Sequence, residues 1–227
     1  MVEDETANSE KEKEALISFW LKNKFVKDQR VIEAFRAIDR RDFVLPYQKA
    51  IAYEDRPLPI LAEQTISQPT TVVQMLEALE LKPGMAVLEI GAGSGYNAAL
   101  IAELVKPDGK VYSIEIIPEL ADFARANIKK AGLEEIVQVI NADGSKGWPP
   151  AAPYDRIVVT AAAPDIPKAY VEQLKEDGIL LIPVSISEEP ELTELIKARK
   201  QKGGLVKKTL EGYYTFVKLR GEKGYAD

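Results

Sequence analysis

The chain has 227 residues and contains no cysteine and no histidine, which excludes Cys or His nucleophiles, Ser-His-Asp triads, imidazole bases and disulfides. Zinc prefers Cys and His ligands, so we expect no metal site, although the composition leaves open a magnesium ion held by carboxylates alone. Hydrophobic residues make up 46% of the chain and charged residues 29%, as in a folded domain, and the formal net charge is −6.

The N-terminal segment is acidic and has the apolar spacing of helices. Residues 1–15 carry six acidic residues and two lysines, which is not the pattern of a secretory signal peptide. No apolar run approaches the length of a membrane span, so we expect a cytoplasmic protein without a membrane partner. Helices are predicted over residues 10–27 and 30–39, and together they form an N-terminal helical cap.

An irregular segment follows the predicted cap. Residues 42–69 contain Pro46, Pro57, Pro59 and Pro69 among scattered apolar residues, which predicts a loop with one or two short strands. Long irregular segments in compact domains are usually functional or disordered. The apolar content argues against disorder, so we expect this loop to have a function.

From Pro69 onward, short apolar strands alternate with helices. Strands are predicted over residues 85–90, 110–115, 136–141, 156–161 and 179–184, and helices over residues 72–79, 96–105, 118–131 and 166–174. This alternation indicates βαβ units and a parallel sheet, and Gly203-Gly204 indicates a hairpin turn near the end. The predicted fold is α/β: Rossmann-like and doubly wound, with a mostly parallel sheet, a C-terminal antiparallel hairpin and the N-terminal helical cap.

A glycine-rich turn follows the first strand of this regular region. Glu89 and Ile90 end the strand, and Gly91, Gly93 and Gly95 precede the next helix. Glycines allow a tight turn and let backbone N–H groups approach a ligand closely. The spacing departs from the dinucleotide fingerprint G-x-G-x-x-G, and no G-K-[ST] follows as in a phosphate P-loop. Taken alone, the motif is also compatible with a simple tight turn.

Acidic residues stand at the ends of the next two strands. Glu115 is placed where a carboxylate accepts both hydroxyls of a ribose. Asp143, followed by Gly144, is a candidate acceptor for an adenine amino group. Because the carboxyl ends of parallel strands meet at one edge of a sheet, where α/β proteins bind ligands, the turn and the two acids predict one nucleoside site.

These glycines and acids resemble those of class I S-adenosylmethionine-dependent methyltransferases. The blocks AYEDRPLPI (52–60), EQTISQPTTV (63–72), NADGSKGWPPAAPYDRIVVTAAAPDIP (141–167) and LIPV (181–184) are similar to the protein-L-isoaspartate O-methyltransferase family, in family order from about residue 30 to the end. The resemblance implies methyl transfer from S-adenosylmethionine to the free α-carboxylate of L-isoaspartyl residues in damaged proteins, initiating repair through a succinimide. It also implies a single domain, residues 1–227, with a cap and substrate loop (1–68) and a cofactor-binding core (69–227).

The resemblance assigns roles to individual residues. The residues expected to bind S-adenosylmethionine, or its product S-adenosyl-L-homocysteine, are Gln64, Ile66, Glu89, Gly91, Ala92, Gly93, Ser94, Gly95, Glu115, Asp143 and Gly144. The residues expected to hold the substrate are Thr65, Ser67, Gln68, Thr160 and Val184. Ser67 is the expected catalytic residue, and its hydroxyl orients the acceptor carboxylate instead of attacking. Because Ser is also favoured at helix N-caps, an N-cap role for Ser67 remains open, as it does for Thr65.

Two other functions remain open from the sequence. Residues 197–227 carry nine basic and three acidic residues, so an RNA methyltransferase that uses a basic tail is one alternative, although the chain has no N/D-P-P-Y motif of amine methylation. The other is a module that only binds an adenosine ligand or a protein. We expect isoaspartyl proteins as partners, no nucleic acid and a monomer. Scarce Asn with abundant Lys and Glu predicts a heat-adapted source.

Overall fold

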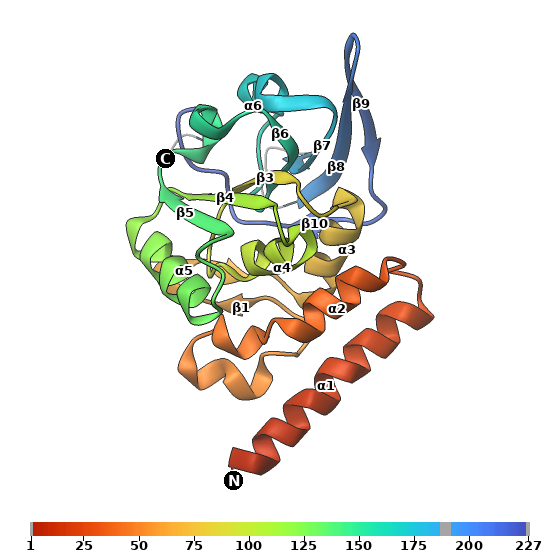
Figure 1. Ribbon diagram of the computed structural model, residues 1–227, viewed down its shortest axis with the longest axis vertical. Coiled ribbons are helices and arrows are strands. Elements are labelled where there is room, and N and C mark those ends of the chain that lie inside the picture. The colour runs from red at the N-terminus through yellow and green to blue at the C-terminus, as the bar shows by residue number, and fades with distance from the viewer. Residues whose placement is uncertain (1, 187–191, 226–227) are drawn as a thin grey trace.

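The computed structural model describes residues 2–186 and 192–225, with side chains described from Ser9 onward. Within these residues a central eight-stranded sheet has the order β10-β8-β7-β6-β3-β4-β5, with β9 paired to β8 (Figure 1). Its strands are β3 (Ala86–Ile90), β4 (Lys110–Glu115), β5 (Val137–Asn141), β6 (Tyr154–Val159), β7 (Leu174–Ser185), β8 (Leu192–Gln201), β9 (Gly204–Thr209) and β10 (Tyr214–Thr215). Strands β3 to β7 pair in parallel, and β8 joins β7, β9 and β10 antiparallel. The predicted fold class is confirmed.

Helices cover both faces of the sheet because strand side chains alternate between them. The regular helices of the core are α3 (Pro69–Leu79), α4 (Tyr96–Val105), α5 (Pro118–Lys130) and α6 (Lys168–Gln173). Val87 belongs to the hydrophobic core shared with α3, α4 and α5, whereas the next residue, Leu88, belongs to a second core with Tyr170 of α6. The sheet therefore separates two cores, and its carboxyl edge is left to hold a ligand.

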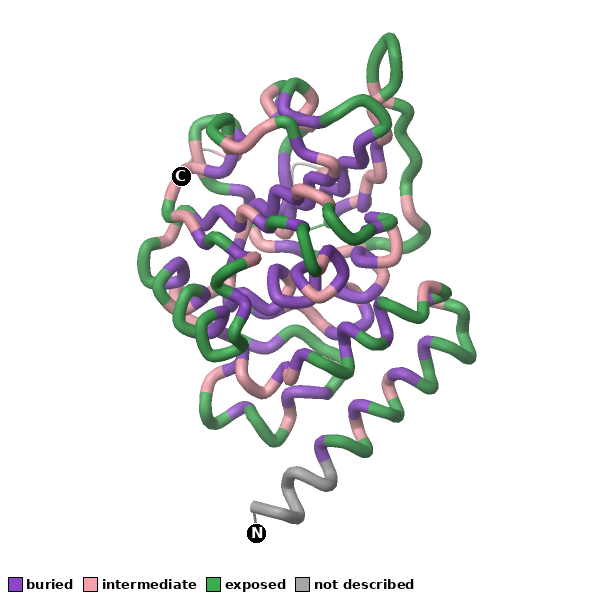
Figure 2. Tube along the Cα trace, in the orientation of Figure 1, coloured by how far each residue is buried: buried purple, intermediate pink, exposed green. Residues whose placement is uncertain are grey.

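The N-terminal cap consists of α1 (Val2–Lys22) and α2 (Gln29–Ala37). Figure 2 shows a single buried stripe along α1, which ends at Trp20. Trp20 is fully buried and donates from Nε1 to Oγ1 of Thr70, 2.7 Å away. This contact ties the cap to the start of α3. The helix ends five residues earlier than residue 27, the predicted boundary, and Lys24 just beyond it takes a positive φ of 59°.

The irregular segment between cap and core is confirmed as a loop with two short strands. Strands β1 (Leu58–Pro59) and β2 (Thr65–Ile66) pair antiparallel, and the short 3-10 helices η1 (Arg40–Asp42), η2 (Pro46–Ile51) and η3 (Leu61–Glu63) complete it. Many of its apolar side chains are buried, among them Phe43, Tyr53 and Leu58. This burial fixes the loop beside the carboxyl edge of the sheet.

The observed boundaries in the core lie close to those predicted, with two differences. Strand β7 begins at Leu174 and not at residue 179, so it follows α6 without a loop. Gln201 pairs with Gly204, so the hairpin turn consists of Lys202 and Gly203 and lies one residue before the predicted turn. Along the described ranges, no helix is both long enough and apolar enough to cross a membrane.

Candidate functional site

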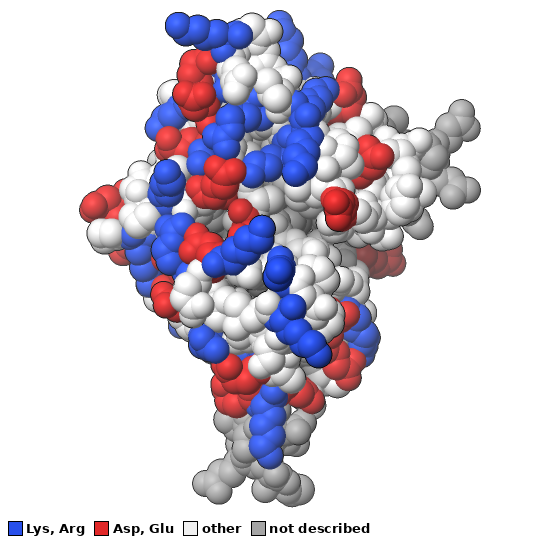
Figure 3. Space-filling view, turned by 90° about the vertical axis from the view of Figure 1, so that its right-hand side faces the viewer, with Lys and Arg blue, Asp and Glu red and all other residues white. Residues whose placement is uncertain are grey.

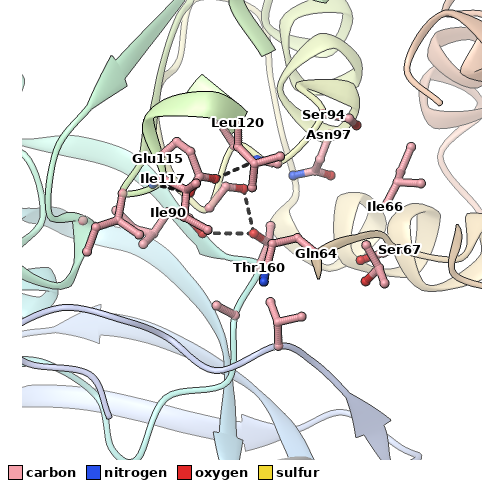
Figure 4. Close-up of a pocket in the computed structure, with 18 of the residues that line it drawn as sticks. Gln64, Ile66, Ser67, Ile90, Ser94, Asn97, Glu115, Ile117, Leu120 and Thr160 are labelled. Carbon is pink, nitrogen blue, oxygen red and sulfur yellow. Dashed lines mark hydrogen bonds between the residues drawn. The ribbon is translucent and has the colours of Figure 1, made fainter. Parts of the chain in front are cut away.

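A cleft lies along the carboxyl ends of β3, β4 and β6 and contains about 930 Å³ of empty space, part of it open to solvent. In Figure 4, Glu115 and Ser67 lie on opposite sides of Thr160. The cleft brings together these residues predicted from the sequence: Gln64, Thr65, Ile66, Ser67, Gly91, Ala92, Gly93, Ser94, Glu115, Gly144 and Thr160.

The glycine turn joins the ends of two neighbouring strands. Gly91 has a φ of +96°, and a Cβ at this position would lie 2.3 Å from Oγ1 of Thr160. The Thr160 hydroxyl donates to the Gly91 carbonyl at 2.7 Å, which fixes the end of β6 against the turn. Glycine is therefore required at position 91 both for its backbone conformation and for this close approach.

Glu115 is held in place by backbone groups on both carboxylate oxygens. Oε2 accepts from the Gly93 N–H at 2.9 Å, and Oε1 accepts from the Ile117 N–H at 3.0 Å. An ionised carboxylate has about four acceptor positions, so capacity remains on each oxygen. Because Glu115 lines the cleft, this remaining capacity suits the two hydroxyls of a ribose.

Glu89 lies behind the cleft lining instead of in it. The residue is fully buried and accepts from Nδ2 of Asn97 at 2.8 Å and from the hydroxyl of Ser113. Burial raises the pKa of Glu89 to about 7, and Glu115 also raises it, while the two hydrogen bonds act in the opposite direction. With its Nδ2 held by Glu89, Asn97 has a buried Oδ1 with no partner within the described ranges, and Asn97 lines the cleft. Asn97 thus has an unused acceptor atom in the wall of the cleft.

Ser67 lines the cleft and also a second cavity beside it. Its hydroxyl makes no hydrogen bond to any residue of the described chain, and the N-cap of α3 is Gln68, which makes no side-chain cap bond. Asp55 caps the helix instead, because its Oδ1 accepts from the Thr70 N–H at 2.9 Å. The N-cap alternative for Ser67 is therefore wrong, and the hydroxyl is free to bind a ligand.

The second cavity extends away from the glycine turn. It shares Thr65, Ser67, Thr160 and Val217 with the cleft. The rest of its lining comes from Phe25, Pro57, Gln68, the first turns of α3 and residues 211–216. The two cavities meet at these shared residues, Ser67 among them, so two different ligands can approach each other there.

Four other expected residues lie outside the cleft lining. Gly95 is the N-cap of α4, and Gln68 lines only the second cavity. Val184 lines neither cavity and forms a parallel bridge with Ala163. Asp143 faces the C-terminal segment: its Oδ1 accepts from the Ser145 N–H and hydroxyl at 2.9 and 2.6 Å, and its Oδ2 from the Glu222 N–H at 3.0 Å.

Several lining residues were not expected from the sequence. Residues 217–220 form one wall of the cleft, where the Leu219 N–H donates to the Ala162 carbonyl at 2.7 Å. Asn97, which lines the cleft, also escaped prediction, as did Ser113, which lies behind the lining and donates to Glu89. The only local signal for Asn97 was a polar residue in the first turn of an otherwise apolar helix, and nothing local marked Ser113 or the wall.

Comparisons with known proteins identify the family to which this chain is similar. The family model described as "Protein-L-isoaspartate(D-aspartate) O-methyltransferase (PCMT)" matches residues 10–224. Curated relatives named protein-L-isoaspartate O-methyltransferase include those of Methanopyrus kandleri, 49% identical over 89% of this chain and 88% of the relative, and Pyrococcus horikoshii, 53% identical over 89% and 90%. These relatives come from thermophiles, which agrees with the heat-adapted source predicted from composition.

Solved structures give the same result. A protein-L-isoaspartate O-methyltransferase is 31% identical and superposes with a TM-score of 0.83 over 95% of this chain and 67% of that chain. A structure from Plasmodium falciparum, described as a putative protein-L-isoaspartate O-methyltransferase in complex with S-adenosyl-L-homocysteine, is 26% identical, with a TM-score of 0.78 over 91% and 97%. Sequence and fold therefore point to one family.

Proposed function

The chain belongs to the protein-L-isoaspartate O-methyltransferase family, and from this premise we propose how its residues carry out the family reaction. With S-adenosylmethionine, the enzyme methylates the free α-carboxylate of L-isoaspartyl residues in damaged proteins, and the ester then closes to a succinimide. The observation that carries the proposal is the free Ser67 hydroxyl at the junction of the two cavities. The division into a cap with its substrate loop (1–68) and a cofactor-binding core (69–227) belongs to the same proposal.

The reaction needs no proton transfer by the protein, which fits a chain without histidine. The acceptor is a carboxylate with an ordinary pKa of about 3.5, so it is ionised at neutral pH. S-adenosylmethionine supplies a methyl group on a sulfonium, and the group that leaves is a neutral thioether. The protein therefore contributes alignment and exclusion of water, and alignment of two reactants is worth roughly 7–11 kcal/mol.

The cofactor fits the acceptors that the cleft leaves unused. We assign the two ribose hydroxyls to Glu115, whose oxygens are each held by one backbone N–H. We assign the amino group of the methionine portion to Oδ1 of Asn97, which is buried and lacks a partner within the described chain. Glu89 orients this amide from behind. The turn residues Gly91 to Gly95, with Gln64, Ile66 and Gly144, enclose the remainder of the cofactor.

The isoaspartyl peptide occupies the second cavity in this proposal. Ser67 donates its hydroxyl hydrogen to one oxygen of the acceptor carboxylate and leaves the other directed at the methyl group. Thr65, Gln68 and Thr160 line the same space and hold the peptide on either side. Val184 and Asp143 lie outside the cleft lining. We therefore give them peripheral roles: Val184 at the far margin of the peptide site, and Asp143 beside the adenine.

The partner is a protein and not a nucleic acid, and the working form is a monomer in the cytoplasm in this proposal. Much of the basic charge near the C-terminus is used within the fold: Lys197 and Arg199 pair with Glu80 at 2.6 and 2.8 Å. Light scattering of the purified chain tests the monomer, and a gel-shift titration with RNA tests the partner. A dimer or a tight RNA complex would contradict these two assignments.

The decisive experiment compares two peptides that differ only in one isoaspartyl or aspartyl residue. Radiolabelled methyl transfer from S-adenosylmethionine is expected to the isoaspartyl peptide alone, and the label should be lost as methanol when the ester closes to the succinimide. RNA and an unmodified protein serve as further acceptors. Transfer to RNA, equal transfer to both peptides, or cofactor binding without transfer would overturn the proposal.

A further inference from the structure

Arg40, at the start of η1, is a fully buried arginine without a carboxylate partner. Its side chain has no solvent exposure, and no ion pair to it occurs among the residues that the structure describes. Burial lowers the pKa of Arg40 to about 10, while Tyr96, Tyr53 and Asp55 raise it. The guanidinium therefore stays charged at neutral pH inside the wall of the active site.

The contacts of Arg40 join three separate segments of the chain. Nε donates to the Ala52 carbonyl at 2.7 Å, and Nη2 donates to the Ser67 carbonyl at 2.8 Å. The guanidinium carbon lies 5.1 Å from the ring centroid of Tyr96, the first residue of α4. Since Tyr96 follows the glycine turn directly and lines the cleft, one side chain connects the turn, the loop that carries Ser67 and the segment around Ala52.

The burial of Arg40 is unfavourable in free energy compared with the burial of an apolar side chain. Burying a charge costs free energy that an apolar side chain of similar volume does not incur, and Nη1 of Arg40 has no partner within the described chain. Arginine offers something that an apolar residue cannot provide, which is several fixed donors in one plane together with stacking on an aromatic ring. One of these fixed donors holds the carbonyl of Ser67, the residue that contacts the substrate in the proposed function.

We propose that Arg40 is a positioning residue for methyl transfer: it fixes the backbone of Ser67 relative to the glycine turn and thereby aims the Ser67 hydroxyl at the acceptor carboxylate. This inference rests on the proposed role of Ser67. Small errors in alignment reduce the rate of transfer steeply, while both ligands keep most of their contacts. Loss of Arg40 therefore acts on kcat more than on KM or on cofactor affinity.

The first test uses Arg40→Met, which keeps the volume and removes the charge and donors. We expect kcat for an isoaspartyl peptide to fall about 10²-fold, with little change in KM or in the Kd of S-adenosyl-L-homocysteine measured by calorimetry. Arg40→Lys reaches only one of the two carbonyls and should lose less; it also serves if Arg40→Met does not fold. Wild-type kcat in a folded Arg40→Met or Arg40→Lys variant would overturn the proposal.

Arg156 provides a matched control. It is also a buried arginine that donates to backbone carbonyls, those of Leu79 at 2.5 Å and Glu80 at 3.0 Å. These contacts hold the C-terminal end of α3, which does not line the cleft. Arg156→Met should lower the melting temperature and leave kcat unchanged at a temperature where the variant is folded. An equal loss of kcat in Arg156→Met would show a general effect of removing a buried arginine and would overturn the assignment to Arg40.

A double-mutant cycle with Ser67→Ala separates this inference from the proposed function. If Arg40 acts through Ser67, Arg40→Met should lower kcat far less in the Ser67→Ala background than in the wild type. The same fold-loss in both backgrounds would overturn the inference while leaving the role of Ser67 intact. Wild-type turnover in Ser67→Ala alone would instead overturn the role of Ser67, and the Arg40 inference with it.

Discussion

Ser67 has a hydroxyl without a hydrogen-bond partner in the described chain and a backbone carbonyl that is held by a hydrogen bond from Arg40. Ser67 lines both cavities, and its carbonyl accepts from the buried Arg40. The backbone of Ser67 is thus held by the fold while its hydroxyl has no partner in the described chain, as expected of the proposed role in aligning reactants without exchanging protons.

The Ser67→Ala variant removes the hydroxyl and nothing else. We expect turnover with an isoaspartyl peptide to fall about 10²-fold or more, since the carboxylate loses its only oriented donor in the proposed geometry. The Kd of S-adenosyl-L-homocysteine, measured by calorimetry, should stay nearly constant. Ser18→Ala on the exposed face of α1 is the control, and turnover equal to that control would remove Ser67 from the mechanism.

Glu89 gives a second prediction, on pH and stability. Its folded pKa of about 7 lies above the ordinary value of about 4.3 in an unfolded chain. Its contribution to stability is therefore fully present below the unfolded value and is lost as the pH rises through the folded pKa. Glu89→Gln cannot titrate, so its free energy of unfolding relative to the wild type should rise by about 2 kcal/mol from pH 5 to pH 8. Urea titrations across this range measure the difference, and a pH-independent difference would contradict the raised pKa.

The predictability of single residues depends on how local their contacts are. Ser67, Glu89 and Glu115 stand beside recognisable motifs, so the sequence alone placed them at the correct edge of the sheet. The roles proposed for Arg40 and Asn97 depend on partners far along the chain or on unpaired atoms that only the folded molecule creates. No local pattern distinguishes Arg40 from other arginines, and the polar position of Asn97 in the first turn of an apolar helix does not reveal its unpaired acceptor.

At the scale of elements, prediction worked where apolar periodicity is strong. Helix α4 and strand β4 have the predicted boundaries, because most of the side chains in each element are buried. Strand β7 extends further than predicted, through the charged residues 175–177. The path of residues 217–220 along the cleft is set by pairing with Ala162, and pairing between distant segments leaves no signature in local sequence.

That C-terminal segment leads to a prediction for Asp143. Asp143 accepts from the Glu222 N–H, just beyond the residues that form the cleft wall, and it lies beside the proposed adenine position. Asp143→Ala should weaken S-adenosyl-L-homocysteine binding about tenfold, because the charge-assisted hydrogen bonds that join Asp143 to Ser145 and to the Glu222 N–H are lost. Lys146→Ala removes the exposed ion pair with Glu222 and a 4.0 Å contact with Asp143 but leaves the hydrogen bonds of Asp143 in place, so affinity should be nearly unchanged. Equal calorimetric affinity of Asp143→Ala and wild type would remove Asp143 from the site.

Gly221→Ala distinguishes the two ways in which Asp143 can act. A Cβ at Gly221 would lie 2.1 Å from Oδ1 of Asp143, so the substitution displaces the segment while leaving the carboxylate available to an adenine. Weaker cofactor binding in Gly221→Ala is expected if Asp143 anchors the wall. Unchanged binding in this variant, together with a loss in Asp143→Ala, would assign Asp143 to direct contact with the adenine instead.

At the scale of the whole molecule, the basic residues of the C-terminal region are dispersed. They do not form a continuous basic surface on the face that carries the β8–β9 hairpin. Figure 3 shows acidic side chains interspersed with basic ones over this face. Lys200 donates to the carbonyls of Val171 and Leu174 at 2.8 and 2.7 Å, so its ammonium is also used within the fold. Nucleic-acid binding depends on basic groups that are free to contact phosphates. On this hairpin Lys202, Lys207 and Lys208 make no ion pair within the described chain, so these three lysines are the ones to test for such contacts.

Reversing the charge of these three residues tests whether the hairpin contacts a protein substrate, a nucleic acid or neither. The variant carrying Lys202→Glu, Lys207→Glu and Lys208→Glu should keep the wild-type kcat/KM for a neutral isoaspartyl peptide, because the hairpin lies outside both cavities. Added RNA should inhibit neither protein at physiological salt. Loss of peptide methylation in the variant would place substrate on the hairpin. Inhibition of the wild type by RNA, relieved in the variant and at high salt, would instead identify the hairpin as a nucleic-acid site, since phosphate contacts weaken steeply as salt rises.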